Sequence, residues 1–231
     1  MKAMILAAGK GSRMGSLTLH TPKPLTLLAG KTLIEHHLIR FKNASITEIY
    51  INISYHGDKI KSYLGDGKKY GVNITYLDES NLMLGTGGGI LNALPLLGEN
   101  PFWLINADVF TDFEIRLDLE LNRNFLGHLF LVPNPEHNSR GDFYLSDSLI
   151  SYSQNNRPLT FSGISLLSPN LFDGVNEQIF SLEPILDTAA INKSLSGEVY
   201  EGYWSDIGSQ DRLKQAEKYL KQVISDNLND E

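Results

Sequence analysis

The stretch Ala3-Met-Ile-Leu-Ala-Ala-Gly-Lys-Gly-Ser-Arg-Met14 joins an apolar run of six residues to a glycine-rich loop. The run at 3–8 predicts a buried β-strand. Glycines that follow a strand leave backbone N–H groups open, and such groups can surround a phosphate chain. This stretch therefore predicts the first strand of a sheet, with an anion site at its carboxyl end.

Apolar, β-branched runs and helical patterns alternate along the first half of the chain. Strands are predicted at 3–8, 48–54, 73–79 and 102–107, and helices at 31–43, 57–64 and 86–97. Strands joined by helices of this length need crossover connections, which give a largely parallel sheet buried on both faces. The first half is thus predicted to be a doubly wound α/β fold.

The alternation of strand and helix patterns is less regular after residue 108. Strands are predicted at 128–132, 143–153, 160–167 and 197–204, around a helix at 182–192. Helical spacing of apolar residues over 211–224 predicts a closing amphipathic helix, followed by a polar, frayed end at 225–231. The sequence has no clear linker and no internal repeat, so we expect one domain over 1–231.

The composition is that of a soluble globular domain, with 231 residues, 42% hydrophobic and 20% charged. Cysteine is absent, which excludes disulfides, cysteine-ligated zinc and a thiol nucleophile. The histidines lack metal-ligand spacing, and no G-x-S-x-G elbow supports a serine hydrolase. No stretch approaches the roughly 18 apolar residues of a membrane-spanning helix, and no signal peptide is recognisable, so we expect a cytoplasmic protein.

The net charge of −7 argues against a nucleic-acid-binding protein, but the charges are distributed unevenly. Residues 1–34 contain no Asp or Glu, and their cations are Lys2, Lys10, Arg13, Lys23 and Lys31. A cationic patch on an acidic protein suits a compact anion such as a nucleoside triphosphate.

Two well-known phosphate loops do not match this sequence. The dinucleotide fingerprint G-x-G-x-x-G would begin at Gly9 and Gly11, but Met14 stands at its third glycine. A P-loop ending in Gly30-Lys-Thr32 would need a glycine where Leu25 stands. Neither loop is therefore predicted.

A longer signature does match. The segments Leu6-Ala-Ala-Gly-Lys-Gly-Ser-Arg13-Met14 and Thr21-Pro-Lys23-Pro-Leu25 resemble the L-A-A-G-x-G-x-R and P-K-P motifs of the sugar-1-phosphate nucleotidyltransferase family. The residue types suit that chemistry, because arginine can bind phosphate bidentately and the prolines restrain the lysine. A tight turn with solvated basic residues is the structural alternative, which the length of the match disfavours.

The resemblance implies the fold of the nucleotide-diphospho-sugar transferases, an α/β, Rossmann-like three-layer sandwich with a mixed, mainly parallel sheet. Residues 1–110 would form the nucleotide-binding half, 111–208 the sugar-binding half and 209–231 a C-terminal helix. The nucleotide contacts that it implies are Leu6, Ala7, Ala8, Gly9, Gly11, Ser12, Arg13 and Lys23.

The segment Leu84-Gly-Thr-Gly-Gly-Gly-Ile90 places a glycine cluster at the start of a predicted helix. Glycine destabilises a helix, so the cluster indicates that a ligand ring or a neighbouring backbone approaches closely. An ordinary helix start is the alternative. In the resembled family the corresponding turn lies against the base, which implies nucleotide contacts at Gly85 and Thr86.

The segment Leu104-Ile-Asn106-Ala-Asp108 is an apolar run that ends in a carboxylate. Ligands of open α/β sheets bind beyond the carboxyl ends of the strands, where Asp108 can hold a divalent cation. The resemblance implies Mg²⁺ here, with Asp206 of Tyr203-Trp-Ser-Asp-Ile-Gly208 as the second ligand, although Ala107 replaces the glycine usual in the family. For either aspartate alone, a turn or helix cap is the alternative.

Three further segments, 138–143, 160–164 and 180–186, resemble the short N-acetylmuramate-1-phosphate uridylyltransferases within this family. The sugar contacts that this resemblance implies are Asn106, Gly141, Asp142, Gly163 and Glu183. An ordinary surface carboxylate is the alternative for Asp142 and Glu183. The E-K-P lysine that binds the sugar phosphate in larger relatives has no match, and Arg157 is a candidate to replace it.

The implied reaction joins a nucleoside triphosphate, most simply UTP, to a sugar-1-phosphate such as N-acetylmuramate-1-phosphate, and releases pyrophosphate. Its catalytic residues would be Arg13, Lys23 and Asp108, with no protein nucleophile. The resemblance also implies a role in recycling peptidoglycan sugar. We expect a monomer or small homo-oligomer that binds neither nucleic acid nor membrane.

Other functions share parts of this signature. Glucose-1-phosphate or mannose-1-phosphate could take the place of the muramyl sugar. A phosphocholine cytidylyltransferase would need an aromatic cage for the quaternary ammonium, for which Tyr152, Phe161 and Trp204 are available. A non-catalytic nucleotide-sensing module is the remaining alternative, which the joint presence of the loop cations and both aspartates disfavours.

Overall fold

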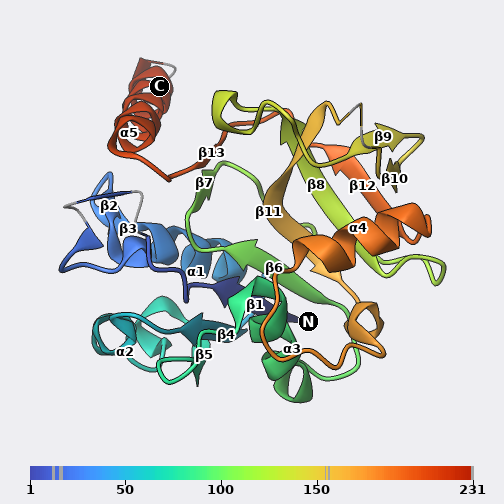
Figure 1. The fold of residues 1–231 in the computed structure, drawn as a ribbon. Helices are drawn as coiled ribbons and strands as arrows, with labels where there is room; N and C mark the ends of the chain where they lie inside the picture. Colours follow the sequence, from blue (N-terminus) through green and yellow to red (C-terminus); the bar gives the residue numbers. More distant parts are fainter. Residues whose placement is uncertain (12–13, 16–17, 154, 156, 230–231) are drawn as a thin grey trace.

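The computed structural model describes residues 1–11, 14–15, 18–153, 155 and 157–229. Within them, nine strands form one sheet in the order β5-β4-β1-β6-β11-β8-β12-β10-β9 (Figure 1). The bounds of these strands are β1 Lys2–Leu6, β4 Glu48–Ile53, β5 Asn73–Asp78, β6 Phe102–Asn106, β8 Gly127–Pro133, β9 Tyr144–Ser146, β10 Leu149–Ser151, β11 Leu159–Leu167 and β12 Leu195–Val199. The α-helices are α1 Leu33–Asn43, α2 Gly57–Leu64, α3 Gly85–Leu97, α4 Glu183–Ile191 and α5 Gln210–Asn229.

The strands of the first half are parallel and those of the second half are mixed. β5, β4, β1 and β6 run in one direction, as expected for strands joined by helices. β11 is antiparallel to both β6 and β8, whereas β12 is parallel to β8. β10 and β9 complete the sheet as an antiparallel edge. This arrangement confirms the predicted α/β fold with a mixed sheet.

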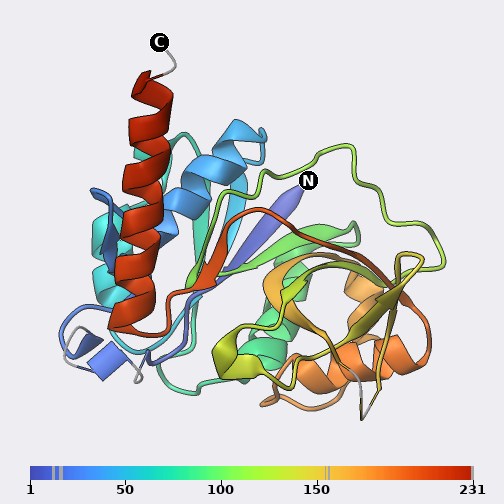
Figure 2. The same ribbon diagram turned by 90° about the horizontal axis from the view of Figure 1, so that it is seen from above.

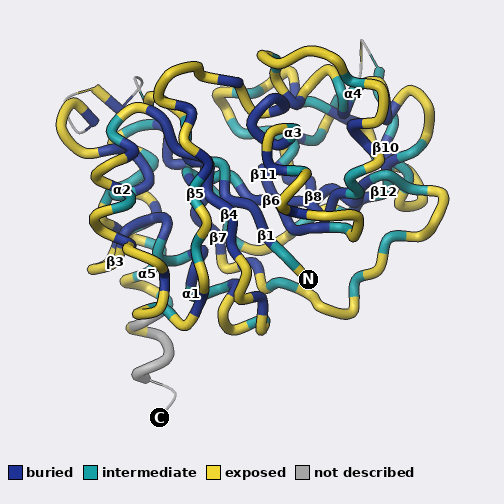
Figure 3. The backbone as a smooth tube through the Cα atoms, turned by 90° about the horizontal axis from the view of Figure 1, so that it is seen from below, coloured by how far each residue is buried: buried dark blue, intermediate teal, exposed yellow. Residues whose placement is uncertain are grey.

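Successive side chains of each strand point to opposite faces of the sheet, which divides the core into two layers. Ile49, Ile51 and Ile53 of β4 belong to the apolar cluster under α1 and α2, while Tyr50 belongs to the cluster under α3 and α4. Figures 1 and 2 show these helix pairs on opposite faces of the sheet. Because both faces are covered, the central strands are buried along most of their length, as the dark blue tube in Figure 3 shows.

Two helices differ from their predicted bounds by more than one residue at an end. The helix expected at 31–43 begins at Leu33, because Thr32 and Glu35 form a capping box and Lys31–Thr32 forms the short strand β3, paired with β2 (Leu27–Leu28). The helix expected at 211–224 continues as α5 to Asn229, since no Gly or Pro interrupts it. The prediction of a frayed end is therefore wrong for residues 225–229, which are helical, and 230–231 lie outside the described residues.

Two strands expected in the second half are interrupted. The run at 143–153 forms the β9–β10 hairpin, because Asp147 and Ser148 turn the chain at φ +50° and +63°, a conformation that short polar residues tolerate. The run at 197–204 leaves the main sheet after β12. It re-forms as β13 (Trp204–Asp206), which pairs with β7 (Val109–Thr111), and Thr111 Oγ1 donates to Tyr203 O (2.7 Å) beside this pair.

Helix α5 closes the molecule beside α1 and β2. Ala216 of α5 is buried in a third apolar cluster, whose other buried members are Met14, Leu28, Leu33, Phe110 and Ile207. Tyr219 stacks on Tyr203 with ring centres 3.8 Å apart and donates to Asp112 Oδ2 (2.7 Å). The far end of α5 extends beyond the body of the protein in Figure 2. Among the described residues, no helix combines the length and apolar character needed to cross a membrane.

Phe130→Ala is expected to lower the free energy of unfolding by about 3–5 kcal/mol, because removing a buried ring leaves a cavity. Phe130 has no exposed surface and lies beside Trp103 and Phe113, with ring centres 5.8 and 4.5 Å away. Urea denaturation measures the change. The matched control is Leu117→Ala, whose side chain is exposed and whose stability should change by less than about 0.5 kcal/mol. Equal losses in the two variants would contradict the assigned core.

Candidate active site

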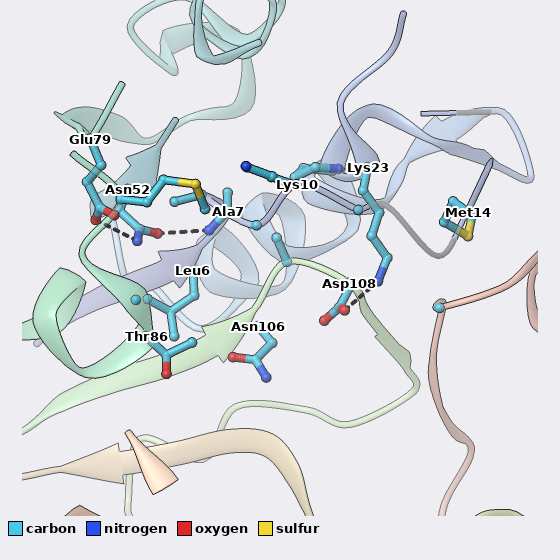
Figure 4. Close-up of a pocket in the computed structure, with 18 residues that line it drawn as sticks. Leu6, Ala7, Lys10, Met14, Lys23, Asn52, Glu79, Thr86, Asn106 and Asp108 are labelled. Carbon is cyan, nitrogen blue, oxygen red and sulfur yellow. Dashed lines mark hydrogen bonds and ion pairs between the residues drawn. The ribbon is translucent and has the colours of Figure 1, made fainter. Parts of the chain in front are cut away.

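A cavity of about 360 Å³ lies beyond the carboxyl ends of β1, β4 and β6 (Figure 4). Parallel strands end at the same edge of a sheet, so segments that are far apart in the sequence meet there. The lining residues are Leu6, Ala7, Ala8, Gly9, Lys10, Gly11, Met14, Lys23, Pro24, Asn52, Glu79, Met83, Gly85, Thr86, Asn106, Ala107, Asp108 and Gly208. Ten of the residues predicted from the sequence are therefore gathered around one cavity.

The glycine-rich loop after β1 forms one wall. Gly11 has φ +63°, and a side chain there would begin 3.0 Å from Lys23 Cβ, so glycine allows the loop to lie against the lysine. The carbonyl oxygen of Gly11 accepts hydrogen bonds from Met14 N–H (3.0 Å) and Thr18 Oγ1 (2.9 Å). The predicted contacts Ser12 and Arg13 lie outside the described residues.

Lys23 is held between two prolines at the start of the 3-10 helix η2 (Lys23–Leu25). Pro22 is extended, and Pro24 occupies an early helical position where its missing N–H costs nothing. The Lys23 side chain is buried with its Nζ 2.5 Å from Asp108 Oδ2, as Figure 4 shows. The P-K-P motif thus fixes a cation at one end of the cavity.

Asp108 follows β6, where the chain turns into β7. The N–H of Ala107 donates to Leu6 O (3.0 Å), which extends the β1–β6 pairing as far as the cavity. The carbonyl of Asp108 accepts from Ile207 N–H (2.7 Å), which ties the turn to the segment after β13. The site therefore pairs an ammonium group with a carboxylate, one able to bind phosphate and the other able to bind a hard cation.

The glycine cluster at the start of α3 forms the opposite wall. Gly85 has φ +76°, and a side chain there would begin 2.5 Å from Phe180 O. Gly87 N–H donates to the same carbonyl (3.0 Å), and Thr86 Oγ1 accepts from Leu182 N–H (2.8 Å). The predicted close approach of a neighbouring backbone is confirmed, and it comes from the segment that precedes α4.

The residues predicted to contact the sugar are dispersed. Asn106 lines the cavity, and Gly163 packs against it, since a side chain at Gly163 would begin 2.5 Å from Asn106 Nδ2. Gly141 is buried against Arg157 O, and Asp142 accepts hydrogen bonds from Asn138 Nδ2 and Phe161 N–H. Glu183 is exposed on the first turn of α4. A sugar role for all five of these residues stays a prediction.

Asp206 lies on β13, the strand paired with β7, but it does not line the 360 Å³ cavity. Its Oδ1 is 2.5 Å from Arg212 Nη1 and 3.1 Å from His137 Nε2, beside a neighbouring cavity of about 1020 Å³. Within the described residues, no three His, Asp or Glu side chains converge as a ready metal site. Joint cation binding by Asp108 and Asp206 stays a prediction.

Two polar residues in the cavity wall were not predicted from the sequence. Asn52 of β4 and Glu79, which follows β5, are both buried and hydrogen-bonded to each other. Burial raises the pKa of Glu79, and hydrogen bonds from Asn52 and Leu84 oppose that shift. The available signal was the asparagine itself, because a polar residue inside the apolar run Ile49-Tyr-Ile-Asn-Ile53 needs a partner when buried.

Asp187 was also missed. It lies one turn after Glu183 on α4 and is half-buried. Burial raises the pKa of Asp187, and the charges of Glu183 and Asp142 add to the rise while that of Arg157 opposes it. The guanidinium of Arg157 also lies over the ring of Tyr152, 5.4 Å from its centre. Three carboxylates and one arginine thus share the region where sugar contacts are predicted.

Comparison with known proteins assigns the family. The Nucleotidyl transferase family model matches residues 2–141, more than half of the chain. The chain belongs to the nucleotidyl transferase family. The match includes the glycine-rich loop, the P-K-P motif and Asp108, so it confirms the family predicted from these motifs.

Individual nucleotidyl transferases match over nearly the whole chain. The chain is 46% identical over 224 residues to the N-acetylmuramate alpha-1-phosphate uridylyltransferase of Neisseria meningitidis, covering 94% of this chain and 97% of that protein. It is 31% identical over 244 residues to the Caulobacter vibrioides protein of the same name, covering 96% and 97%. A Bacillus anthracis structure assigned as a glucose-1-phosphate thymidylyltransferase matches with TM-score 0.84 and 23% identity over 95% of this chain and 94% of that one, which confirms the fold.

Gly85→Ala is expected to destabilise this nucleotidyl transferase more than Gly174→Ala. Both glycines have left-handed φ values, +76° and +77°, so either alanine costs about 1–2 kcal/mol. Only at Gly85 does the new methyl group also meet a backbone atom, Phe180 O, whereas the space at Gly174 is open. Urea denaturation of the two variants compares the losses, and equal losses would show that Phe180 does not constrain the cavity wall.

Proposed function

We propose that this protein transfers the uridylyl group of UTP to N-acetylmuramate α-1-phosphate, giving UDP-N-acetylmuramate and pyrophosphate. The observation that carries the substrate assignment is the 46% identity to the Neisseria meningitidis enzyme over nearly the full length of both chains. The cavity supports the chemistry, because it combines a glycine-rich loop with the Lys23–Asp108 pair. The setting would be cytoplasmic recycling of peptidoglycan sugar by a monomer or small homo-oligomer.

The proposed reaction is one in-line displacement. A phosphate oxygen of the sugar-1-phosphate attacks the α-phosphorus of UTP, and a new P–O–P bond forms. The bond from the α-phosphorus to the β-phosphate bridge oxygen breaks, and pyrophosphate leaves with that electron pair. A phosphate monoester is already an anion at neutral pH, so no protein nucleophile is needed and catalysis consists of positioning and charge neutralisation.

Lys23 and the loop are assigned to the triphosphate. The backbone N–H groups near Gly9 and Gly11 would surround phosphate oxygens, and the Lys23 ammonium would neutralise charge at the reacting end. Arg13 is assigned a second phosphate contact on the strength of its motif. Gly85 and Thr86, on the opposite wall, are assigned to the nucleoside.

Magnesium is the proposed cofactor. Mg²⁺ in proteins is commonly held by one or two carboxylates together with phosphate oxygens and water, and Asp108 offers such a carboxylate inside the cavity. Asp206, on the paired strand, is the proposed second ligand, and it would exchange Arg212 for the metal. Bound Mg²⁺ would neutralise phosphate charge and orient the triphosphate.

Residues 111–208 are assigned to the sugar, with Asn106 at the boundary with the nucleotide. Gly163 supports Asn106, while Asp142 and Glu183 are candidate partners for sugar hydroxyl or amide groups. Arg157 is the candidate contact for the sugar phosphate. Thr86 Oγ1 accepts a hydrogen bond from the N–H of Leu182, the residue that precedes Glu183. The sugar-binding region would therefore adjoin the cavity wall that contains Thr86.

The phosphocholine alternative lacks its aromatic cage. Tyr152 and Phe161 pack against the cluster under α3 and α4, whereas Trp204 packs against the cluster under α1 and α2. The Nε1–H group of Trp204 donates to Ser162 O (2.8 Å), which fixes the ring on its own side. A quaternary ammonium ion therefore cannot be enclosed by these three rings, and a sugar phosphate is favoured.

Pyrophosphate release tests the proposal. UTP, CTP, dTTP and GTP are each combined with Mg²⁺ and with N-acetylmuramate-1-phosphate, N-acetylglucosamine-1-phosphate, glucose-1-phosphate, mannose-1-phosphate or phosphocholine. Release is expected with UTP and the muramyl sugar. Release with another pair alone would keep the reaction class and replace the substrates. Nucleotide binding without release from any pair would instead support a nucleotide-sensing module.

Lys23→Ala and Asp108→Ala are each expected to lower kcat by about 10²–10³-fold, because each removes a charge at the reacting phosphates. Initial rates of pyrophosphate release measure the effect, and circular dichroism checks the fold. Lys214→Ala and Asp118→Ala are the matched controls, since both side chains are exposed and lie outside the cavity. Parental turnover in either cavity variant would overturn its catalytic assignment.

A further inference from the structure

Four hydrogen bonds link the carboxyl ends of three neighbouring strands. Ala7 N–H donates to Asn52 Oδ1 (2.8 Å), and Asn52 Nδ2 donates to Glu79 Oε1 (2.8 Å). The other oxygen of Glu79 accepts from Leu84 N–H (3.2 Å), and Ser54 Oγ donates to Glu79 O (3.2 Å). Together these residues form a hydrogen-bond relay, which starts at Ala7 in the glycine-rich loop after β1 and ends at Leu84, the residue that precedes α3.

The relay is buried and tightly enclosed. Asn52 and Glu79 are only 2% and 3% exposed. A side chain at Gly89 of α3 would begin 2.7 Å from Asn52 Nδ2 and 2.8 Å from Glu79 Oε1. The third glycine of the Gly87-Gly-Gly89 run thus allows α3 to lie directly on this pair. Buried polar groups need their partners, so the pair has little freedom to rearrange.

The two ends of the relay lie at the two opposite walls of the cavity. Ala7, at one end, belongs to the glycine-rich wall, and Leu84, at the other, directly precedes the wall residues Gly85 and Thr86. Asn52 and Glu79 line the cavity between them, as Figure 4 shows. We propose that Asn52 and Glu79 are positioning residues that fix the spacing of these walls and thereby set the affinity for the nucleotide.

The proposal rests on the nucleotide site of the proposed function, and it assigns the pair no contact with the reacting atoms. The polarity of the hydrogen bonds makes it testable. Asn52→Asp keeps an acceptor for Ala7 N–H but places two carboxylates against each other. Glu79→Gln supplies only one acceptor for two donors, Asn52 Nδ2 and Leu84 N–H. Each single change therefore breaks the relay at one link.

The double variant, which combines Asn52→Asp with Glu79→Gln, restores every link. The new carboxylate at position 52 would accept from Ala7 N–H and from the new amide at position 79, whose oxygen would accept from Leu84 N–H. The pair retains one negative charge and nearly the same volume, so only the position of the charge is exchanged. Recovery in the double variant is thus a signature of the relay rather than of either side chain alone.

The experiment measures nucleotide binding and turnover separately. Titration calorimetry with Mg²⁺ and UTP, CTP, dTTP or GTP, in the absence of sugar phosphate, gives the dissociation constant for each variant. Each single variant is expected to bind the preferred nucleotide at least tenfold more weakly, and the double variant within threefold of the parent. The KM for the sugar phosphate is expected to change less than twofold throughout. Asn176→Asp, at an exposed position, is the control for the added charge.

Gly89→Ala provides a second route if the single variants fail to fold. The added methyl group pushes on Asn52 and Glu79 without removing either, while alanine itself favours the helix. Tenfold weaker nucleotide binding by this folded variant is expected. Parental affinity in the folded variants, no recovery in the double variant, or an equal rise in the KM for the sugar phosphate would each overturn the positioning role. Failure of the parent to bind any nucleotide would overturn the proposed function as well.

Discussion

The register of β1 between β4 and β6 determines the site. Leu6 is paired with Asn52 on one side and with Asn106 on the other. A slip of one residue would turn each side chain of β1 to the opposite face of the sheet, away from its own apolar cluster. Because burial holds this register, the loop that follows Leu6 begins beside Asn52. On the other side, Ala107 follows Asn106 and lies close enough to Leu6 for its N–H to donate to Leu6 O. The glycine-rich loop and Asp108 therefore reach the same cavity.

The first half of the fold could be predicted because its strands are buried on both faces. Such strands are nearly continuous apolar runs, and the helices between them have clear periodicity. The second half was predicted less well, since its strands are short and their ends depend on tertiary contacts. The division between β12 and β13 follows from hydrogen bonds of Thr111 and Asp112 to residues some ninety positions later. No local pattern contains that information.

The same distinction applies to the site. The glycine-rich loop, Lys23 and Asp108 are local motifs, and the structure gathers them. The Asn52–Glu79 pair was missed because each residue has meaning only through the other, across two neighbouring strands. The predicted partnership of Asp108 and Asp206 depends on side-chain direction as well as on strand pairing. The motifs indicate which residues along the chain are functional, whereas the partners of those residues, such as Arg212 for Asp206, are set by three-dimensional contacts.

The Lys23–Asp108 pair explains how the cavity can keep a cation before a substrate arrives. A buried ammonium group without a partner would be strongly destabilising, and Asp108 compensates its charge. A triphosphate offers the lysine several oxygens and carries more negative charge than one carboxylate. If the proposed function is right, the lysine would therefore exchange its carboxylate partner for phosphate. That exchange would free an oxygen of Asp108 for a hard cation at the moment when phosphate charge enters the site. Binding of anion and cation would then be mutually favourable, because each removes the partner that holds the other group.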